Sequence, residues 1–274
     1  MIEVIATGGL ATVQDRGRPG YAHLGVGRSG AADQAALALA NRLVGNPLDA
    51  AAIEVTLGGL VLRAHRAVTV ALTGAACPGP LGWGVAVTIR AGAVIELGVP
   101  PTQLRSYLAV RGGIDVAAVL GSRSTDLLSG LGPPPLRPAT RLPIGDAGAD
   151  PVSGEPAIPG RGPSRLRLIP GPREDWFGDD ALTRLTSTAW TVRSDSNRVG
   201  IRLDGPPLPR TRTGELATEA TLPGALQVPP DGRPILLGPD APVTGGYPVI
   251  GVLAGSALDA AGQLRPGDQV WFRV

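Results

Sequence analysis

The residues of this chain that are best suited to chemistry lie in four short polar segments that glycine flanks or interrupts. They are residues 12–18 (TVQDRGR), 111–115 (RGGID), 196–200 (SNRVG) and 244–248 (TGGYP). Each one alone has the composition of a turn, because Asp, Asn, Ser and Gly favour local hydrogen bonds and positive φ. Together they combine Arg, Asn, Gln and Thr side chains with glycines that allow close approach to the backbone. Recognition of an anion or an amide requires that combination.

The basic residues narrow this chemistry, because all 25 are arginine and the chain contains no lysine. A Walker A lysine, a Schiff base, a pyridoxal phosphate anchor and a biotinyl-lysine are therefore excluded within this chain. A phosphate or carboxylate would be bound by arginine, by backbone N–H groups or by a partner chain.

Other reactive residue types give weaker signals. His23 and His65 have neither metal-ligand spacing nor a neighbouring nucleophile motif, so we expect no metal site and no Ser-His-Asp triad. The single cysteine, Cys77, is expected to be a buried or turn thiol. Residues 25–30 match GxGxxG, but glycine and proline interrupt the strand that a dinucleotide-binding loop must follow. We interpret this segment as a glycine loop before a helix rather than a dinucleotide-binding loop, and the helix N-terminus with an arginine beside it stays a candidate anion site.

Short β-branched runs bounded by Gly and Pro must position these segments, and they predict a mainly β protein. Gly58-Gly59 between two of the runs predicts a two-residue hairpin, because both central positions of a type I′ turn need positive φ. The predicted strands are 53–57, 60–63, 68–73, 85–89, 94–97, 107–110, 166–169, 190–193, 226–228, 235–237, 249–253 and 270–274.

Helices are expected to be few and short. Apolar residues at i, i+3 and i+7 predict one helix over 32–44, with Ser29 or Asp33 as its cap and Gly45 after its end. A second helix is expected over 179–185. A stretch rich in Pro and Gly between residues 133 and 163 marks a boundary between two halves, 1–160 and 161–274.

Composition excludes several classes of protein. The 274 residues are 43% hydrophobic with a net charge of +2, which is typical of a globular protein. Aromatic residues are only 3% and no arginine run occurs, so we expect no nucleic-acid partner. No apolar run approaches about 18 residues and the N-terminus lacks a secretory pattern, so we expect a cytoplasmic protein without a membrane segment.

The polar segments and the elements around them carry a family resemblance. The chain resembles the family of 5-oxoprolinase C subunits, also known as KipA, allophanate hydrolase subunit 2 or the biotin-dependent carboxyltransferase family. The resemblance implies two cyclophilin-like β-barrel domains. It spans nearly the whole chain and rests on the motifs TVQDRGRPG, ALANRLVGN, IEVTLGG, ALTGA, SYLAVRGGID, GSRSTD, IPGP, SNRVGIRLDG, LPGALQVPPDGRPILL and TGGYPVI, which occur in that order.

The resemblance implies three alternative functions. In the first, the chain works with a KipI-like B subunit and a LamB/YcsF-like A subunit to open the lactam of 5-oxoproline to glutamate, using ATP with Mg²⁺. In the second, it is a carboxyltransferase component of the urea carboxylase type, with biotin carried by another chain. In the third, it is a regulator that binds a KipI-like kinase inhibitor and has no turnover. A small amide or lactam is the expected substrate of the first two.

The first alternative implies roles for the polar segments. Phosphate transfer to the lactam oxygen would make the ring carbon electrophilic towards water, a step that depends on positioning and charge neutralisation. The donors would be arginines, Arg16 included, and glycine amides. The expected catalytic residues are Asp15, Arg18, Asn197 and Arg198. The expected substrate-binding residues are Gln14, Arg111, Gly112, Gly113, Gln227, Thr244, Gly245, Gly246 and Tyr247.

Overall fold

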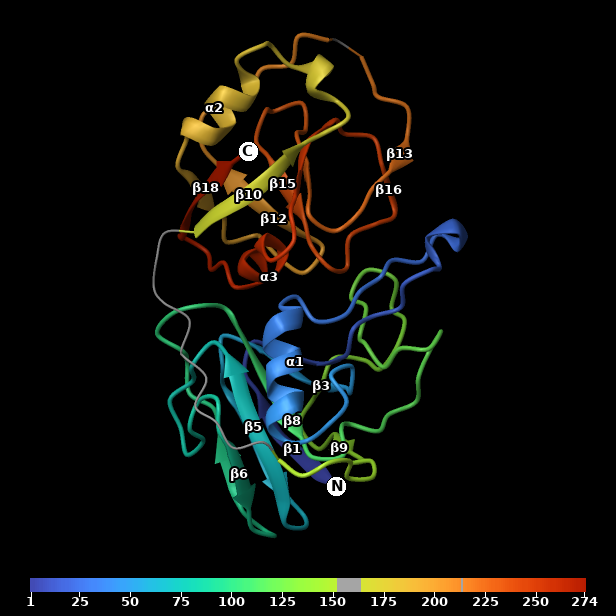
Figure 1. Ribbon diagram of the computed structural model, residues 1–274, viewed down its shortest axis with the longest axis vertical. Helices are drawn as coiled ribbons and strands as arrows, with labels where there is room; N and C mark the ends of the chain where they lie inside the picture. Colours follow the sequence, from blue (N-terminus) through green and yellow to red (C-terminus); the bar gives the residue numbers. More distant parts are fainter. Residues whose placement is uncertain (152–163, 213) are drawn as a thin grey trace. The chain divides into compact units, whose positions relative to one another are not determined.

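A computed structural model describes residues 1–151, 164–212 and 214–274 (Figure 1). The chain divides into two compact units, each of which is described by itself. The first unit contains Met1–Arg18, Ser29–Asp126 and residues 130–151, and the second contains Pro19–Arg28, Leu127–Ser129 and the described residues from 164 onward. The predicted boundary between residues 160 and 161 lies outside the described residues.

Two antiparallel sheets form the first unit. Their strand orders are β7-β4-β1-β9 and β2-β3-β8-β5-β6. The strands are β1 (Ile2–Thr7), β2 (Leu10–Gln14), β3 (Ala52–Thr56), β4 (Leu60–Ala64), β5 (Val68–Gly74), β6 (Ala86–Ile89), β7 (Val94–Glu96), β8 (Arg105–Val110) and β9 (Arg141–Leu142).

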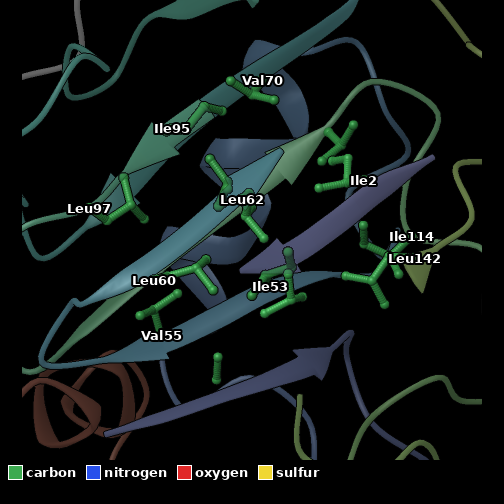
Figure 2. Close-up of a cluster of buried hydrophobic side chains, with 14 of the residues drawn as sticks. Ile2, Ile53, Val55, Leu60, Leu62, Val70, Ile95, Leu97, Ile114 and Leu142 are labelled. Carbon is green, nitrogen blue, oxygen red and sulfur yellow. The ribbon is translucent and has the colours of Figure 1, made fainter. Parts of the chain in front are cut away.

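Alternating apolar residues of both sheets meet in one core. Ile53 and Val55 of β3 and Leu60 and Leu62 of β4 belong to the same buried cluster (Figure 2). Because side chains alternate between the two faces of a strand, the i, i+2 spacing of these residues directs one face of each strand into that core.

Helix α1 (Gln34–Leu43) covers the other face of the five-stranded sheet. Leu37 and Ala40 pack in a cluster with Ala71, Tyr107 and Ala109 of β5 and β8. This confirms the predicted helix.

The helix also ends where the sequence predicted. Of the two predicted N-terminal caps, Ser29 and Asp33, Asp33 is the one that caps the helix, because its side chain accepts a hydrogen bond from the Ala36 N–H at 2.8 Å. Gly45, with φ of +75°, follows the end of the helix.

The predicted hairpin around Gly58-Gly59 is wrong in its pairing. The two glycines have the expected positive φ of 67° and 79°, but Leu57 is also left-handed with φ of 60°. The longer turn carries the chain from β3 in one sheet to β4 in the other. A Cβ at Gly58 would lie 2.1 Å from the Gly98 carbonyl oxygen, so this corner requires glycine.

Seven strands of the second unit close into a barrel. Its order is β10-β17-β14-β15-β12-β11-β18, and β10 closes it by pairing in parallel with β18. The strands are β10 (Ser164–Pro170), β11 (Trp190–Val192), β12 (Gly200–Asp204), β14 (Ala225–Gln227), β15 (Ile235–Leu237), β17 (Val249–Leu253) and β18 (Gln269–Arg273), and a separate pair consists of β13 (Glu219–Ala220) and β16 (Thr244–Gly245).

Short helices accompany the barrel. They are α2 (Ala181–Ser187), which confirms the second predicted helix, and α3 (Ala257–Gly262), which was not predicted. Single 3-10 turns occur at η1 (Ala22–Leu24) and η2 (Glu174–Trp176). Trp190 and Phe272 lie in the buried core of this unit.

The mainly β prediction is thus confirmed, with a closed barrel in the second unit and two packed sheets in the first. Among the described residues, every helix is too short or too polar to cross a bilayer.

Candidate functional site

The predicted catalytic residue Asp15 follows β2 and is buried. Its Oδ1 accepts hydrogen bonds from the Gly17 N–H at 2.8 Å, Ser122 Oγ at 2.6 Å and Ser124 Oγ at 2.5 Å, and its Oδ2 accepts one from the Arg123 N–H at 2.6 Å. A carboxylate offers about four lone-pair sites, and these four hydrogen bonds place three donors at Oδ1 and one at Oδ2. The side chain therefore holds the 122–124 loop in place.

Arg18 lies in the same region and is only 1% exposed. Its Nη2 donates to the Ser124 carbonyl at 2.5 Å, and its Nη1 lies 3.8 Å from Asp126 Oδ2. The opposite charge of Asp126 compensates the buried guanidinium, as a charge inside a protein requires.

Gln14 completes this network. Its Nε2 donates to the Thr12 hydroxyl and to the Thr125 carbonyl, each at 3.0 Å. Within the described residues, Gln14 Oε1, Arg18 Nη1 and Thr125 Oγ1 are buried without a hydrogen bond. Such unmatched donors and acceptors can bind a water molecule or another small polar group.

Arg111, Gly112 and Gly113 form a second group in the first unit. Arg111 Nη2 donates to Asp150 Oδ1 at 3.0 Å and to the Ala149 carbonyl at 3.2 Å. Gly112 is a position of close approach, as predicted, but the group that approaches it is protein backbone rather than a substrate. A Cβ at Gly112 would lie 2.3 Å from the Gly145 carbonyl oxygen.

The glycine amides of this group have partners inside the protein. The Gly112 N–H donates to Asn46 Oδ1 and the Gly113 N–H to the Val110 carbonyl, each at 2.8 Å. Their predicted role as donors to a substrate stays a prediction.

Arg198 lies in the second unit and makes a buried ion pair. Its Nε donates to Asp240 Oδ2 at 2.8 Å and its Nη2 to Asp240 Oδ1 at 2.9 Å, with both side chains at most 1% exposed. The neighbouring Asn197 is exposed and accepts hydrogen bonds from the Val199 and Gly200 N–H groups. This geometry buries Arg198 in an ion pair within the barrel and places Asn197 in a turn, and the catalytic roles predicted for both stay predictions.

Three of the remaining predicted residues, Gln227, Gly245 and Tyr247, lie in a partly open group with two residues that were not predicted. We call this group the Tyr247 cluster, and its members are Trp176, Arg210, Gln227, Gly245 and Tyr247. Gln227 Nε2 lies 3.4 Å from the Tyr247 carbonyl oxygen. A Cβ at Gly245 would lie 2.6 Å from that amide nitrogen, so glycine leaves room for the carboxamide. Tyr247 is 43% exposed.

Arg210 is the member of the cluster that the sequence did not reveal. Its Nη2 donates to the Val228 carbonyl at 2.5 Å, and its guanidinium lies 5.9 Å from the centre of the Trp176 ring. Desolvation lowers the pKa of Arg210, while the charge interaction with Tyr247 opposes that shift. Thr244 and Gly246 are exposed beside the cluster.

The Tyr247 cluster combines an exposed tyrosine, the buried Gln227 carboxamide and the partly buried Arg210 guanidinium. A guanidinium donates hydrogen bonds, whereas a carboxamide and a phenol both donate and accept them, as a planar amide requires of its partners. Gln227 and Tyr247 were predicted from the sequence, but Arg210 and Trp176 were missed, because their only local signals are an arginine after proline and an isolated aromatic residue.

A second network that the sequence did not reveal lies under α1. Glu54 Oε2 accepts hydrogen bonds from the Ala32 N–H at 3.0 Å and from the Tyr107 hydroxyl at 2.8 Å. The Tyr107 oxygen in turn accepts from the Asp33 N–H at 2.8 Å. Burial, with the charge of Glu54, raises the pKa of Tyr107 well above its usual value. This network attaches the start of the helix to the sheet.

Known proteins are similar to this chain over nearly its whole length. The Carboxyltransferase domain family, subdomain A and B, matches residues 24–274. The 5-oxoprolinase C subunit of Escherichia coli K12 is 39% identical over 282 residues, which cover 99% of this chain and 90% of that protein.

Two solved structures are also similar. The crystal structure of TTHA0988 has a TM-score of 0.88 and 35% identity, and this chain spans 55% of that crystallised chain. The urea amidolyase of K. lactis has a TM-score of 0.89 and 28% identity, and this chain spans 18% of it.

Proposed function

The chain belongs to the Carboxyltransferase domain family, subdomain A and B, and we propose that within this family it is the C subunit of a cytoplasmic, ATP-dependent 5-oxoprolinase. The observation that carries the proposal is the 39% identity to the 5-oxoprolinase C subunit of E. coli, which extends over nearly the full length of both chains. An enzyme subunit needs partners, and we propose a KipI-like B subunit and a LamB/YcsF-like A subunit.

We place the recognition of the lactam at the Tyr247 cluster. A lactam presents one carbonyl and one N–H in a plane, and the Arg210 guanidinium, the Gln227 carboxamide and the Tyr247 phenol can satisfy both. Arg210 is held in place by the Val228 carbonyl and the Trp176 ring, so little conformational freedom is lost when a substrate binds. The buried Asp15 and Arg198 would support the fold rather than touch the substrate.

The residues of this chain do not fit ATP with Mg²⁺. The chain has no lysine for a phosphate loop. The GxGxxG segment ends at Gly30, where a Cβ would lie 2.8 Å from the Gly17 nitrogen, so protein backbone fills the space beside this glycine. In the described part of the chain, no three His, Cys, Asp or Glu side chains are grouped as metal ligands. We therefore propose that one of the partner proteins binds ATP.

The second candidate is the carboxyltransferase part of a urea carboxylase. The similarity to the K. lactis urea amidolyase favours it. The chain itself cannot carry biotin on a lysine, so a biotinylated carrier would have to be a separate protein or domain.

Reconstitution tests the proposal. The chain is co-expressed with its KipI-like and LamB/YcsF-like partners, and the release of glutamate and ADP from 5-oxoproline and ATP is measured with each of the three proteins omitted in turn. We expect turnover only when all three are present. A stable complex without turnover, in which a biotinylated carrier restores carboxyl transfer to urea, would favour the second candidate. A complex inactive in both assays would favour the inhibitor-binding regulator.

A further inference from the structure

We propose that a pocket in the first unit binds a small organic acid through its carboxylate, with Arg66 and Arg111 as the recognising residues. The pocket has a volume of about 410 Å³ and is lined by Met1, Arg66, Arg111 and residues 143–147. It shares no lining residue with the Tyr247 cluster. The inference does not depend on the proposed function, because it concerns binding to this chain alone.

The charge of the pocket favours an anion. Arg66 is exposed and makes no hydrogen bond or ion pair with any described residue, and Arg111 faces the same space. Asp146 is the only acidic residue among the lining residues. Two guanidinium groups in one concave site attract a carboxylate and can bind it by charge-assisted hydrogen bonds.

Arg111 already shows how a carboxylate binds there. Asp150 Oδ1 accepts a hydrogen bond from Arg111 Nη2 at 3.0 Å, and the Asp150 side chain is 96% exposed. An ion pair with so exposed a partner is weak. An external carboxylate can therefore replace Asp150 at Arg111 and gain Arg66 as a second partner, which Asp150 does not contact.

The walls of the pocket are fixed before a ligand binds. The Gly145 N–H donates to the Gly113 carbonyl at 3.2 Å, and the Asp115 N–H donates to the Pro143 carbonyl at 3.0 Å. The close contact of Gly112 with Gly145 tightens the same wall. A rigid site reduces the entropy lost on binding. The close-approach glycines that the sequence placed at a substrate site thus shape this pocket.

The uncharged part of the lining favours an organic acid over inorganic phosphate. Pro143, Ile144 and Ala147 offer apolar surface beside the guanidinium groups. A short carbon chain can lie against that surface while its carboxylate faces the arginines, which is the usual pattern of small-molecule sites.

Binding to the full chain tests the proposal, with glutarate as the probe and isothermal titration at low salt as the method. We expect Arg66→Gln to weaken glutarate binding by about tenfold, the effect of losing one charge-assisted hydrogen bond. Asp150→Asn removes the internal competitor and should tighten binding. The matched controls are Arg90→Gln and Glu96→Gln, which change the same charges at exposed positions outside the pocket and should leave affinity unchanged.

Several results would overturn the proposal. Unchanged affinity in Arg66→Gln would exclude the pocket, and equal weakening in Arg66→Gln and Arg90→Gln would mean that only net charge matters. Glutaramide, the neutral analogue, should not bind, and binding as tight as that of glutarate would contradict carboxylate recognition. Preference for inorganic phosphate over glutarate would reject the organic acid as the ligand. Arg66 and Asp150 are exposed, so circular dichroism should show folded variants throughout.

Discussion

The buried pair of Arg198 and Asp240 allows the structural and the catalytic interpretation of Arg198 to be separated. Both side chains are at most 1% exposed and are joined by two hydrogen bonds. Replacing Arg198 by Met leaves the Asp240 carboxylate buried without its guanidinium, and we expect a loss of about 3–5 kcal/mol in the free energy of unfolding. Replacing Asp240 by Leu should have an effect of similar size.

The double variant, Arg198→Met with Asp240→Leu, should recover most of that loss because neither buried charge is left without the other. A residual loss of about 1 kcal/mol is expected, because the Leu127 N–H also donates to Asp240 Oδ2 at 3.2 Å. The matched control is Asp195→Asn, which breaks the exposed pair with Arg193 and should leave the denaturation midpoint unchanged.

Urea denaturation followed by tryptophan fluorescence measures these differences. Three of the four tryptophans, Trp176, Trp190 and Trp271, lie in the second unit with the pair, so the signal reports mainly on that unit. A double variant no more stable than the single variants would contradict a structural role for the ion pair. The same variant in the three-protein assay decides the role of Arg198: retained turnover makes it structural, whereas a folded but inactive double variant makes it catalytic.

Three further predictions concern the first unit. Gly112→Ala combines a positive φ of 97° with a clash against the Gly145 carbonyl. It should therefore lower the urea midpoint far more than the control Gly92→Ala, which has positive φ but no neighbouring atom within 4 Å and should lose only about 1 kcal/mol in the free energy of unfolding. Equal effects of the two variants would contradict the close approach at Gly112. Burial raises the pKa of Tyr107 above its unfolded value, so the stability that this group contributes should be complete below about pH 10 and be lost above it by up to about 1.4 kcal/mol per pH unit. Tyr107→Phe should reduce the slope of stability against pH above about pH 10 by that amount in denaturation curves measured across this range. Burial also raises the pKa of the Cys77 thiol, so Ellman's reagent should modify it only after urea unfolds the protein, and rapid modification of the native chain would show that the thiol is accessible.

Local patterns in the sequence predicted most of the strands of the described residues, whereas β1, β2, β9, β12, β13 and β16 were not predicted. Runs of β-branched residues between glycines favour extended backbone whatever their neighbours are, and helix α1 could be predicted from its 3.6-residue period and its Asp33 cap. Helix α3 has only six residues, too few to show a period. The prediction that β3 pairs with β4 was wrong, because glycines permit a turn but do not determine which strand is the hydrogen-bonding partner.

The site was predicted less completely, since partners distant in sequence decide what a polar residue does. Asp15 is hydrogen-bonded to Ser124, which is 109 residues further along the sequence, and Arg198 is hydrogen-bonded to Asp240, which is 42 residues further along. Nothing local distinguishes a buried, paired arginine from one that faces a ligand. Glycine at 245 could be predicted as a position of close approach, but the group it approaches, the Gln227 carboxamide, follows only from the fold.

The most direct test of the central proposal is the conversion of ¹⁴C-labelled 5-oxoproline by the three-protein mixture with ATP, measured with and without this chain and with avidin added to sequester any biotinylated carrier. We expect label to appear in glutamate only when this chain is present, and avidin to have no effect. Full conversion without the chain would contradict the proposal, as would conversion that avidin abolishes.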